Sequence, residues 1–323
     1  MKNCNRIILF EVVKLQCQSI EELQLLVNKA KKYTDQGKVA DYIPALKMAN
    51  PDSLSIALYY PDGNCYSAGD VSENLTLQSI SKVISLALAL MDWGEDYVFD
   101  HVGQEPTGDP FNSIAKLEIS KPSKPLNPMI NAGALAVTHM IKGESVEERF
   151  QRLLTLIQKL ANNSSIGYSR EIARSEFETA DLNRSLCYFL KQHGIINEEV
   201  EQLIDLYTRQ CSIEMNCLDL SRIGCVLAFD GKDPLTEVQL IPANIARICK
   251  TFMVTCGMYN ASGEFAIKVG IPAKSGVSGG ILGTVPGRCG IGVYGPALDE
   301  KGNSVAGIQL LKMMSEKYML SMF

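Results

Sequence analysis

The hydrophobic positions in the first third of the chain predict a surface helix, a β-hairpin and a buried helix. Residues 20–34 repeat apolar side chains with helical period among Glu, Gln and Lys. Residues 53–60 alternate and lead into Pro61-Asp62-Gly63-Asn64, so we expect a strand, a turn and a second strand over 64–68. Residues 79–92 are apolar on nearly every face, which is typical of a helix inside the protein.

The middle and the end of the chain carry different patterns. From 144 to 258 apolar residues recur with helical period almost throughout. Beyond 264 glycine becomes dense and β-branched runs return, which predicts strands over 264–270, 280–285 and 290–294. Residues 305–318 form a last amphipathic stretch and predict a closing helix. Strands at both ends with helices between them indicate an α+β fold with an inserted all-helical lobe.

The composition is that of an ordinary globular protein. The 323 residues are 46% hydrophobic and carry a net charge of −5, without long blocks of like charge. Neither a nucleic acid nor an anionic membrane is therefore expected as a partner. The ten cysteines include no Cys-x-x-Cys pair, which favours a reducing, cytoplasmic compartment over a zinc site. Charged residues closely follow the apolar stretch 7–10, so we expect no signal peptide, and no apolar run is long enough to span a membrane.

Three apparent cofactor or metal motifs are set aside. The segment 290–295 has the form Gly-x-Gly-x-x-Gly, but Pro296 follows where a dinucleotide-binding helix would begin. The histidines, His101, His139 and His193, lack the spacing of a metal site or a catalytic triad. No Gly-x-x-x-x-Gly-Lys-Ser/Thr phosphate loop occurs. We therefore expect no metal and no other cofactor.

Ser79 and Lys82 are the strongest candidates for catalysis. They stand three residues apart at the start of the buried helix, so their side chains face the same way. Burial at the positive end of a helix lowers the pKa of a lysine, which then serves as the base for a serine nucleophile. A serine at this place is also a common N-cap, so the pair alone leaves a structural interpretation open. Lys274-Ser275-Gly276 adds a second element, because penicillin-recognising serine hydrolases pair Ser-x-x-Lys with Lys-Thr-Gly on a strand edge.

Six longer motifs resemble the serine-dependent glutaminase family. They are Asp41-Tyr42-Ile43-Pro44, Leu77-Gln78-Ser79-x-x-Lys82, Asn127-Pro128-Met129-Ile130-Asn131-Ala132-Gly133-Ala134, Cys211-Ser212-Ile213-Glu214, Cys256-Gly257-Met258-Tyr259 and Pro272-Ala273-Lys274-Ser275-Gly276-Val277. The resemblance extends from about residue 20 to the C-terminal helix. It implies a β-lactamase-like fold, with an antiparallel sheet flanked by helices. It also implies hydrolysis of L-glutamine to L-glutamate and ammonia through a glutamyl-enzyme.

The same resemblance implies roles for individual residues. Ser79 would be the nucleophile and Lys82 its base, with Tyr259 close to the nucleophile as a substrate-binding and proton-relaying group. Which group deprotonates Ser79 stays open. A carboxylate suits the ammonium of glutamine, and Asn or Tyr donors suit its carboxylate. The implied substrate-binding residues are Tyr42, Ser79, Asn131, Glu176, Asn183, Tyr207, Tyr259 and Val277, the last through its backbone N–H.

One two-lobed domain over 1–323 is predicted, with the sheet lobe at about 20–75 and 259–323 and the mostly helical lobe at about 79–258. The resemblance implies a homodimer or homotetramer. Two other functions stay open: a β-lactam- or peptide-acting serine hydrolase, and a non-catalytic sensor that binds glutamine. Lys-Ser-Gly in place of Lys-Thr-Gly, and the absence of Ser-Asp-Asn, argue against lactam turnover.

Overall fold

A five-stranded antiparallel sheet forms one side of the molecule. A computed structural model describes residue 17 and residues 19–108 and 124–323 of the chain. The strands of this sheet are β1 (Ser55–Tyr59), β2 (Cys65–Gly69), β6 (Ala273–Ser275), β7 (Gly280–Val285) and β8 (Cys289–Tyr294). Their order is β2-β1-β8-β7-β6, and every neighbouring pair is antiparallel. Strands from both ends of the sequence are therefore joined in one sheet.

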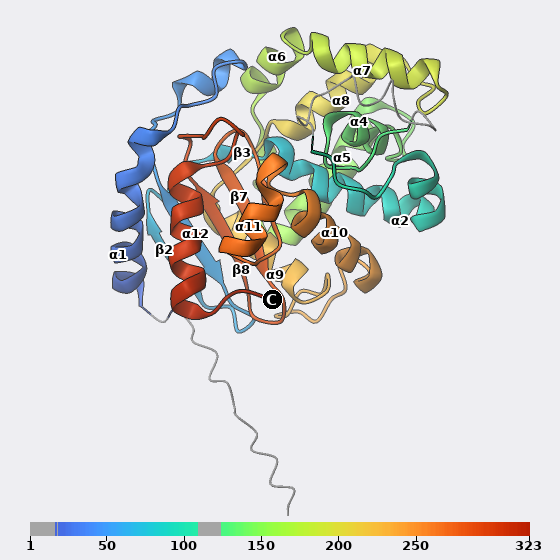
Figure 1. Ribbon diagram of the computed structural model, residues 1–323. Coiled ribbons are helices and arrows are strands. Elements are labelled where there is room, and N and C mark those ends of the chain that lie inside the picture. Colours follow the sequence, from blue (N-terminus) through green and yellow to red (C-terminus); the bar gives the residue numbers. More distant parts are fainter. Residues whose placement is uncertain (1–16, 18, 109–123) are drawn as a thin grey trace, which may run out of the picture.

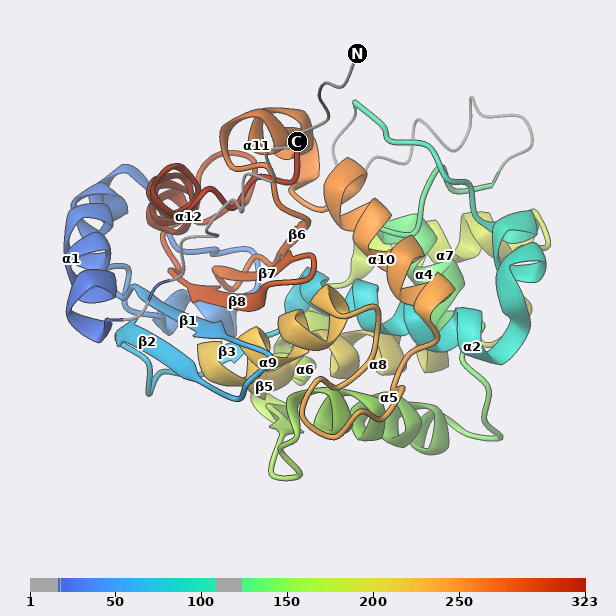
Figure 2. The same cartoon turned by 90° about the horizontal axis from the view of Figure 1, so that it is seen from below.

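Helices cover both faces of this sheet (Figures 1 and 2). On one face, α1 (Ile20–Ala30) and α12 (Val305–Tyr318) share a hydrophobic cluster with strand residues such as Ile56 and Val293, and α11 (Ser262–Lys268) adds Phe265. On the other face, α9 (Cys217–Ala228) packs against β1, β7 and β8. Because the sheet is enclosed on two sides, every residue of β7 and β8 is buried.

Glycines let α9 lie against the backbone of the sheet. A Cβ atom at Gly292 would come within 2.1 Å of the carbonyl oxygen of Cys217, and one at Gly290 within 1.9 Å of that of Ser221. A Cβ atom at Gly224, on the helix side, would lie 2.3 Å from the carbonyl oxygen of Gly283. In the Gly-x-Gly-x-x-Gly segment at 290–295, Gly290 and Gly292 are thus required by the close packing of α9 on the sheet.

We predict that Gly292→Ala lowers the free energy of unfolding by about 2 to 3 kcal/mol, because the helix or the strand must move to admit the methyl group. The measurement is urea unfolding followed by circular dichroism. Gly263→Ala is the matched control, because a Cβ atom there meets nothing within 4 Å. Equal unfolding midpoints for the two variants would contradict this packing.

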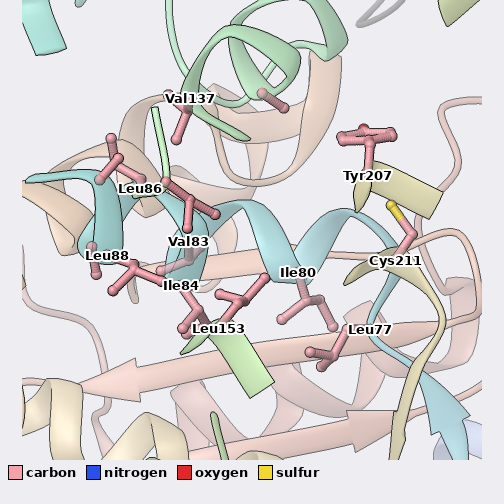
Figure 3. Close-up of a cluster of buried hydrophobic side chains, with 14 of the residues drawn as sticks. Leu77, Ile80, Val83, Ile84, Leu86, Leu88, Val137, Leu153, Tyr207 and Cys211 are labelled. Atoms are coloured by element: carbon pink, nitrogen blue, oxygen red, sulfur yellow. The ribbon is translucent and has the colours of Figure 1, made fainter. Parts of the chain in front are cut away.

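The remaining helices form the other part of the molecule. They are α2 (Ser81–His101), α4 (Asn131–His139), α5 (Val146–Ala161), α6 (Arg170–Glu178), α7 (Asp181–Gln192), α8 (Val200–Cys211) and α10 (Ala243–Cys256). Of these, α4, α5 and α10 pack on α2, whose first ten residues are all buried. Figure 3 shows side chains of α2, among them Val83 and Leu86, in a cluster with Val137 and Leu153. A small sheet, β3 (Leu75–Thr76), β5 (Ile213–Met215) and β4 (Gly167–Tyr168), connects the two parts. The other secondary-structure elements of the described residues are four 3-10 helices: η1 (Lys31–Gln36), η2 (Pro44–Met48), η3 (Gln78–Ile80) and η4 (Tyr259–Ala261).

The predicted antiparallel sheet flanked by helices is confirmed, as are the hairpin, the strands at 280–285 and 290–294 and the closing helix. The predicted strand at 264–270 is wrong, because these residues belong mainly to α11. A strand would place Phe265, Ile267 and Val269 on one face, whereas Phe265 and Val269 are buried and Ile267 is 88% exposed. The edge strand beside β7 is β6 instead. In addition, β4 and β5 interrupt the helices predicted over 144–258.

The described helices are too short or too polar to cross a membrane. The apolar stretch 7–10 and Cys4 lie outside the described residues.

Candidate active site

Ser79 lies in a tight turn between the small sheet and the buried helix. The turn η3 begins after Leu77, whose N–H donates to the carbonyl oxygen of Ile213, and leads directly into α2. Gln78 adopts a left-handed φ of 47°, which is strained for a residue other than glycine. The loop after β6 packs against the turn so closely that a Cβ atom at Gly276 would lie 2.6 Å from the carbonyl oxygen of Leu77. These contacts fix the backbone on both sides of Ser79.

A cavity of about 320 Å³ opens beside Ser79. Seven of the nine site residues predicted from the sequence line it: Tyr42, Ser79, Asn131, Glu176, Asn183, Tyr207 and Val277. They come from segments far apart in the sequence, and Ile43, Gln78, Thr179, Ala180, Leu182 and Cys211 complete the wall. Tyr42 is 56% exposed at the cavity, whereas Ser79 and Glu176 are each 8% exposed. The cavity is therefore a recess with polar groups at its inner end.

Lys82 is fully buried one turn after Ser79 on α2. Its Nζ donates to Asn131 Oδ1 at 2.7 Å and to the carbonyl oxygen of Met129 at 3.2 Å. Burial lowers the pKa of Lys82 to about 8, and the nearby Cys211 and Glu176 offset part of this effect. An amine with this pKa is partly neutral near neutral pH, as a general base must be.

Tyr259 is brought to Ser79 by the end of α10. It begins the turn η4 with a left-handed φ of 50°, and its side chain lies beside that of Ser79. Burial raises the pKa of Tyr259, so the phenol keeps its proton. The Nζ of Lys274 lies 4.5 Å from the centre of the tyrosine ring and donates to the carbonyl oxygen of Ser275 at 2.7 Å. The lysine of the Lys-Ser-Gly motif thus packs against the ring of Tyr259.

Lys274 is a second buried amine in this region. Its pKa is lowered well below the usual value, mainly by burial and further by the charge of Lys82. Two buried lysines therefore lie in this region, Lys82 one turn after Ser79 and Lys274 over the ring of Tyr259.

Glu176 supplies the carboxylate of the cavity from α6. It accepts a hydrogen bond from Gln78 Nε2 at 3.2 Å. Burial raises the pKa of Glu176 to about 7, although Gln78, Cys211 and Lys82 act in the opposite direction. Across the cavity, Asn131 Nδ2 donates to Asn183 Oδ1 at 3.0 Å, so Asn131 joins Asn183 to Lys82.

The sequence interpretation missed Gln78 and Cys211 as cavity residues. Both stand in the quoted motifs, Gln78 directly before Ser79 and Cys211 four residues after Tyr207. In the sequence Cys211 looks like the other buried cysteines, as a small apolar side chain on a helix. Only the fold shows that it borders the cavity. Among the described residues no group of three His, Cys, Asp or Glu side chains could hold a metal ion.

Solved structures with the same fold are glutaminases. One is described as a probable glutaminase from Bacillus subtilis complexed with 6-diazo-5-oxo-L-norleucine. It superposes with a TM-score of 0.87 at 42% identity, covering 96% of this chain and 98% of the other. Another is the covalent complex that a Bacillus subtilis glutaminase forms with 5-oxo-L-norleucine, with a TM-score of 0.85 at 41% identity over 94% and 99% of the two chains. The fold is thus that of the β-lactamase-like glutaminases.

Sequence comparison identifies the family. The family model "Glutaminase" matches residues 37–323. A glutaminase from Shouchella clausii is 69% identical over 95% of this chain and 99% of its own length, and glutaminase 2 of Bacillus subtilis is 64% identical over the same shares. The chain belongs to the glutaminase family, the amidohydrolases that convert L-glutamine to L-glutamate and ammonia.

Proposed function

We propose that Ser79 carries out this hydrolysis as the nucleophile, through a glutamyl ester. The supporting observation is that Ser79 borders the cavity, lies beside Tyr259 and precedes the buried Lys82 by one turn. The covalent complex of the Bacillus subtilis relative agrees with a nucleophile in this family. The hydroxyl of Ser79 passes its proton to the base and its oxygen bonds to the side-chain amide carbon. The C–N bond then breaks, and ammonia leaves with a proton from Lys82 or Tyr259. Water then cleaves the ester to glutamate and restores the Ser79 hydroxyl.

The cavity supplies a partner for each polar group of glutamine. Glu176 faces the ammonium, and Asn131, Asn183, Tyr207 and Tyr42 offer donors for the α-carboxylate. The backbone N–H groups of Ser79 and Val277 form the oxyanion hole for the scissile carbonyl oxygen. No metal or other cofactor takes part in this scheme.

Ammonia release tests this proposal. The purified protein is assayed with L-glutamine, with L-asparagine and with a chromogenic β-lactam. We expect turnover of glutamine, and slower turnover of asparagine, because one methylene is worth about 1 to 3 kcal/mol in a fitted site. Peptide mass analysis after reaction with 6-diazo-5-oxo-L-norleucine should place the adduct on Ser79. Glutamine binding without ammonia release would favour the sensor instead, and lactam turnover alone would favour the other hydrolase.

Glu176→Gln tests the proposed ammonium site. We predict that this variant raises the KM for glutamine about 10- to 100-fold with a smaller change in kcat, because a charged hydrogen-bond partner of the substrate is lost. In the wild type, kcat/KM should fall as the pH drops through the pKa of Glu176, at about 7, because the neutral acid no longer attracts the ammonium. The measurement is a series of saturation curves from pH 6 to 9. An unchanged KM in the variant would place the ammonium elsewhere.

We further propose that residues 1–323 form one two-lobed unit that acts in the cytoplasm as a homodimer or homotetramer. The nine cysteines of the described residues are all free, which suits a reducing compartment. Large apolar side chains such as Met48 and Ile267, each 88% exposed, are available for subunit contacts. Light scattering of the eluting protein gives the mass, and a monomer at micromolar concentration would contradict the oligomer.

A further inference from the structure

A second cavity, of about 360 Å³, adjoins the catalytic one, and Val277 lines both. Its wall is formed by the 3-10 helix η2, by β3 and β5 of the small sheet, and by the turn between β6 and β7. This volume has room for one small organic molecule in place of the roughly ten water molecules that it would otherwise hold. The proposed hydrolysis leaves the second cavity without a function.

Glu214 brings a carboxylate to the second cavity. It lies on β5 opposite Thr76 of β3, and residues paired in this way place their side chains on the same face of a sheet. Both residues line the cavity, whereas Ile213 and Met215, the neighbours of Glu214 along β5, belong to the hydrophobic core. Burial raises the pKa of Glu214. Among the residues that the structure describes, its carboxylate has no hydrogen bond and no ion pair, so its charge is left uncompensated.

Tyr294, the last residue of β8, directs a hydroxyl group into the same cavity. Its side chain is 95% buried, because the residue is only 5% exposed, but the hydroxyl oxygen is not fully enclosed by protein atoms. This hydroxyl forms no hydrogen bond with any described residue. A phenol in such surroundings is unfavourable unless a molecule in the cavity supplies its partner. The second cavity therefore contains a buried polar group that is ready for a ligand.

Glu73 is the second acidic residue of this cavity. Its Oε1 accepts a hydrogen bond from the Ser53 hydroxyl at 2.9 Å, which fixes the side chain. Burial, and then the charge of Glu73, raise the pKa of Tyr294 to about 12, so the phenol keeps its proton. The described residues that line the cavity include no Lys, Arg or His. Two carboxylates without a neighbouring cation give the cavity a negative potential, which attracts a positively charged molecule.

An organic cation suits these groups better than a metal ion. Within the described parts of the chain, no group of three His, Cys, Asp or Glu side chains could hold a metal. Apolar side chains, among them Leu46, Met48 and Ile172, form much of the remaining wall, and they suit methylene groups. A primary ammonium group donates three hydrogen bonds, which carboxylates and the oxygen of a phenol can accept.

We propose that the second cavity binds a small aliphatic ammonium ion, with Glu214 and Glu73 as its charged partners and the Tyr294 oxygen as a hydrogen-bond acceptor. The probe is 1,4-diaminobutane, because it carries an ammonium group at each end of a short methylene chain. Glu176 and Ser79 do not line the second cavity, so this inference does not depend on the proposed catalytic roles.

Isothermal titration calorimetry of the full chain with 1,4-diaminobutane tests this inference. The buffer is free of amines, at about pH 8 to keep the diamine protonated, with about 0.15 M NaCl to screen weak attraction to the protein surface. We expect saturable binding with a Kd below about 1 mM. Glu214→Gln and Glu73→Gln should each weaken binding at least about tenfold, and Tyr294→Phe about threefold, because charged hydrogen bonds contribute more than neutral ones. The uncharged 1,4-butanediol should not bind.

Two control variants show where the diamine binds. Glu176→Gln removes the carboxylate of the catalytic cavity, and Glu264→Gln removes an exposed carboxylate on α11. Both variants should bind the diamine as the wild type does. Binding that is lost in Glu176→Gln and kept in Glu214→Gln would place the diamine in the catalytic cavity and overturn the inference.

Two other results would also overturn the inference. One is the absence of saturable binding up to about 10 mM diamine, and the other is equal affinity for the diamine and the diol. Circular dichroism verifies that each variant is folded. If Glu214→Gln does not fold, Glu73→Gln decides in the same way, and unchanged affinity in that variant rejects the site.

Discussion

Ammonia release from glutamine should fall by at least about a thousandfold in the Ser79→Ala variant, because loss of the proposed nucleophile removes the covalent pathway altogether. The hydroxyl lies at the cavity wall, beside Tyr259 and one turn before Lys82. Substrate binding should survive, since Glu176, Asn131 and Asn183 are untouched. Calorimetry with glutamine should therefore give a dissociation constant close to the KM of the wild type.

Ser85→Ala is the matched control for this loss. Ser85 is equally buried on α2, but its hydroxyl donates to the carbonyl oxygen of Lys82, within the helix, and stays outside the cavity. Its activity should stay within about threefold of the wild type, as expected for a residue away from the reacting atoms. Retained turnover in Ser79→Ala, with 6-diazo-5-oxo-L-norleucine still forming an adduct, would show that another residue is the nucleophile.

The local part of the site could be predicted from the sequence. The three-residue spacing of Ser79 and Lys82 and the apolar residues after them suffice to place both groups at the start of one buried helix. The burial that lowers the lysine pKa follows from that same pattern. This pattern gives no information on the cavity residues that come from other helices, such as Glu176 and Asn183.

Glu176 and Asn183 show where reasoning from a single sequence ends. Without the family resemblance they look like polar residues on the surface of amphipathic helices. The hydrogen bond from Gln78 to Glu176 joins positions 98 residues apart, and that from Asn131 to Asn183 joins positions 52 apart. Such contacts depend on how α6 and α7 pack over the cavity, which periodicity does not encode.

The error at 264–270 has a related cause. β-Branched residues favour strands only as a weak preference, and packing decides when the segment is short. Here Phe265 and Val269 lie on one face of a helix against the core, and Ile267 points into solvent. The correct interpretation requires knowledge of which surface the segment meets.

Burial shifts the pKa values of both Lys82 and Glu176 so that their neutral forms are favoured. The pKa of Lys82 falls to about 8 and that of Glu176 rises to about 7. The negative charge of Glu176 raises the pKa of Lys82, so an ionised Glu176 in the empty cavity keeps more of the lysine protonated and unable to accept a proton. In the proposed binding mode, the substrate ammonium beside Glu176 would cancel that charge. Binding of glutamine would then make Lys82 easier to deprotonate, at the step where the proposed base is needed.

Lys82→Met should lower kcat about 1,000-fold and abolish its acid limb, because a positioned general base contributes about 100- to 10,000-fold. In the wild type, kcat should fall at acid pH, since the protonated amine accepts no proton from Ser79, and the midpoint should lie below the pKa of about 8 that Lys82 has in the empty cavity. Methionine has a similar length and no charge, so the variant should fold, and removing a buried charge should leave the melting temperature equal or higher.

Lys82→Arg and Lys250→Met complete this test. Arginine stays protonated, so Lys82→Arg should be as inactive as Lys82→Met although it keeps the positive charge. Lys250 on α10 pairs with Asp230 away from the cavity, and its replacement by methionine should leave kcat and its pH profile unchanged. A Lys82→Met enzyme that keeps the wild-type acid limb, with only a modest loss of kcat, would transfer the role of base to another group, and Tyr259, which lies beside Ser79, is the first to examine.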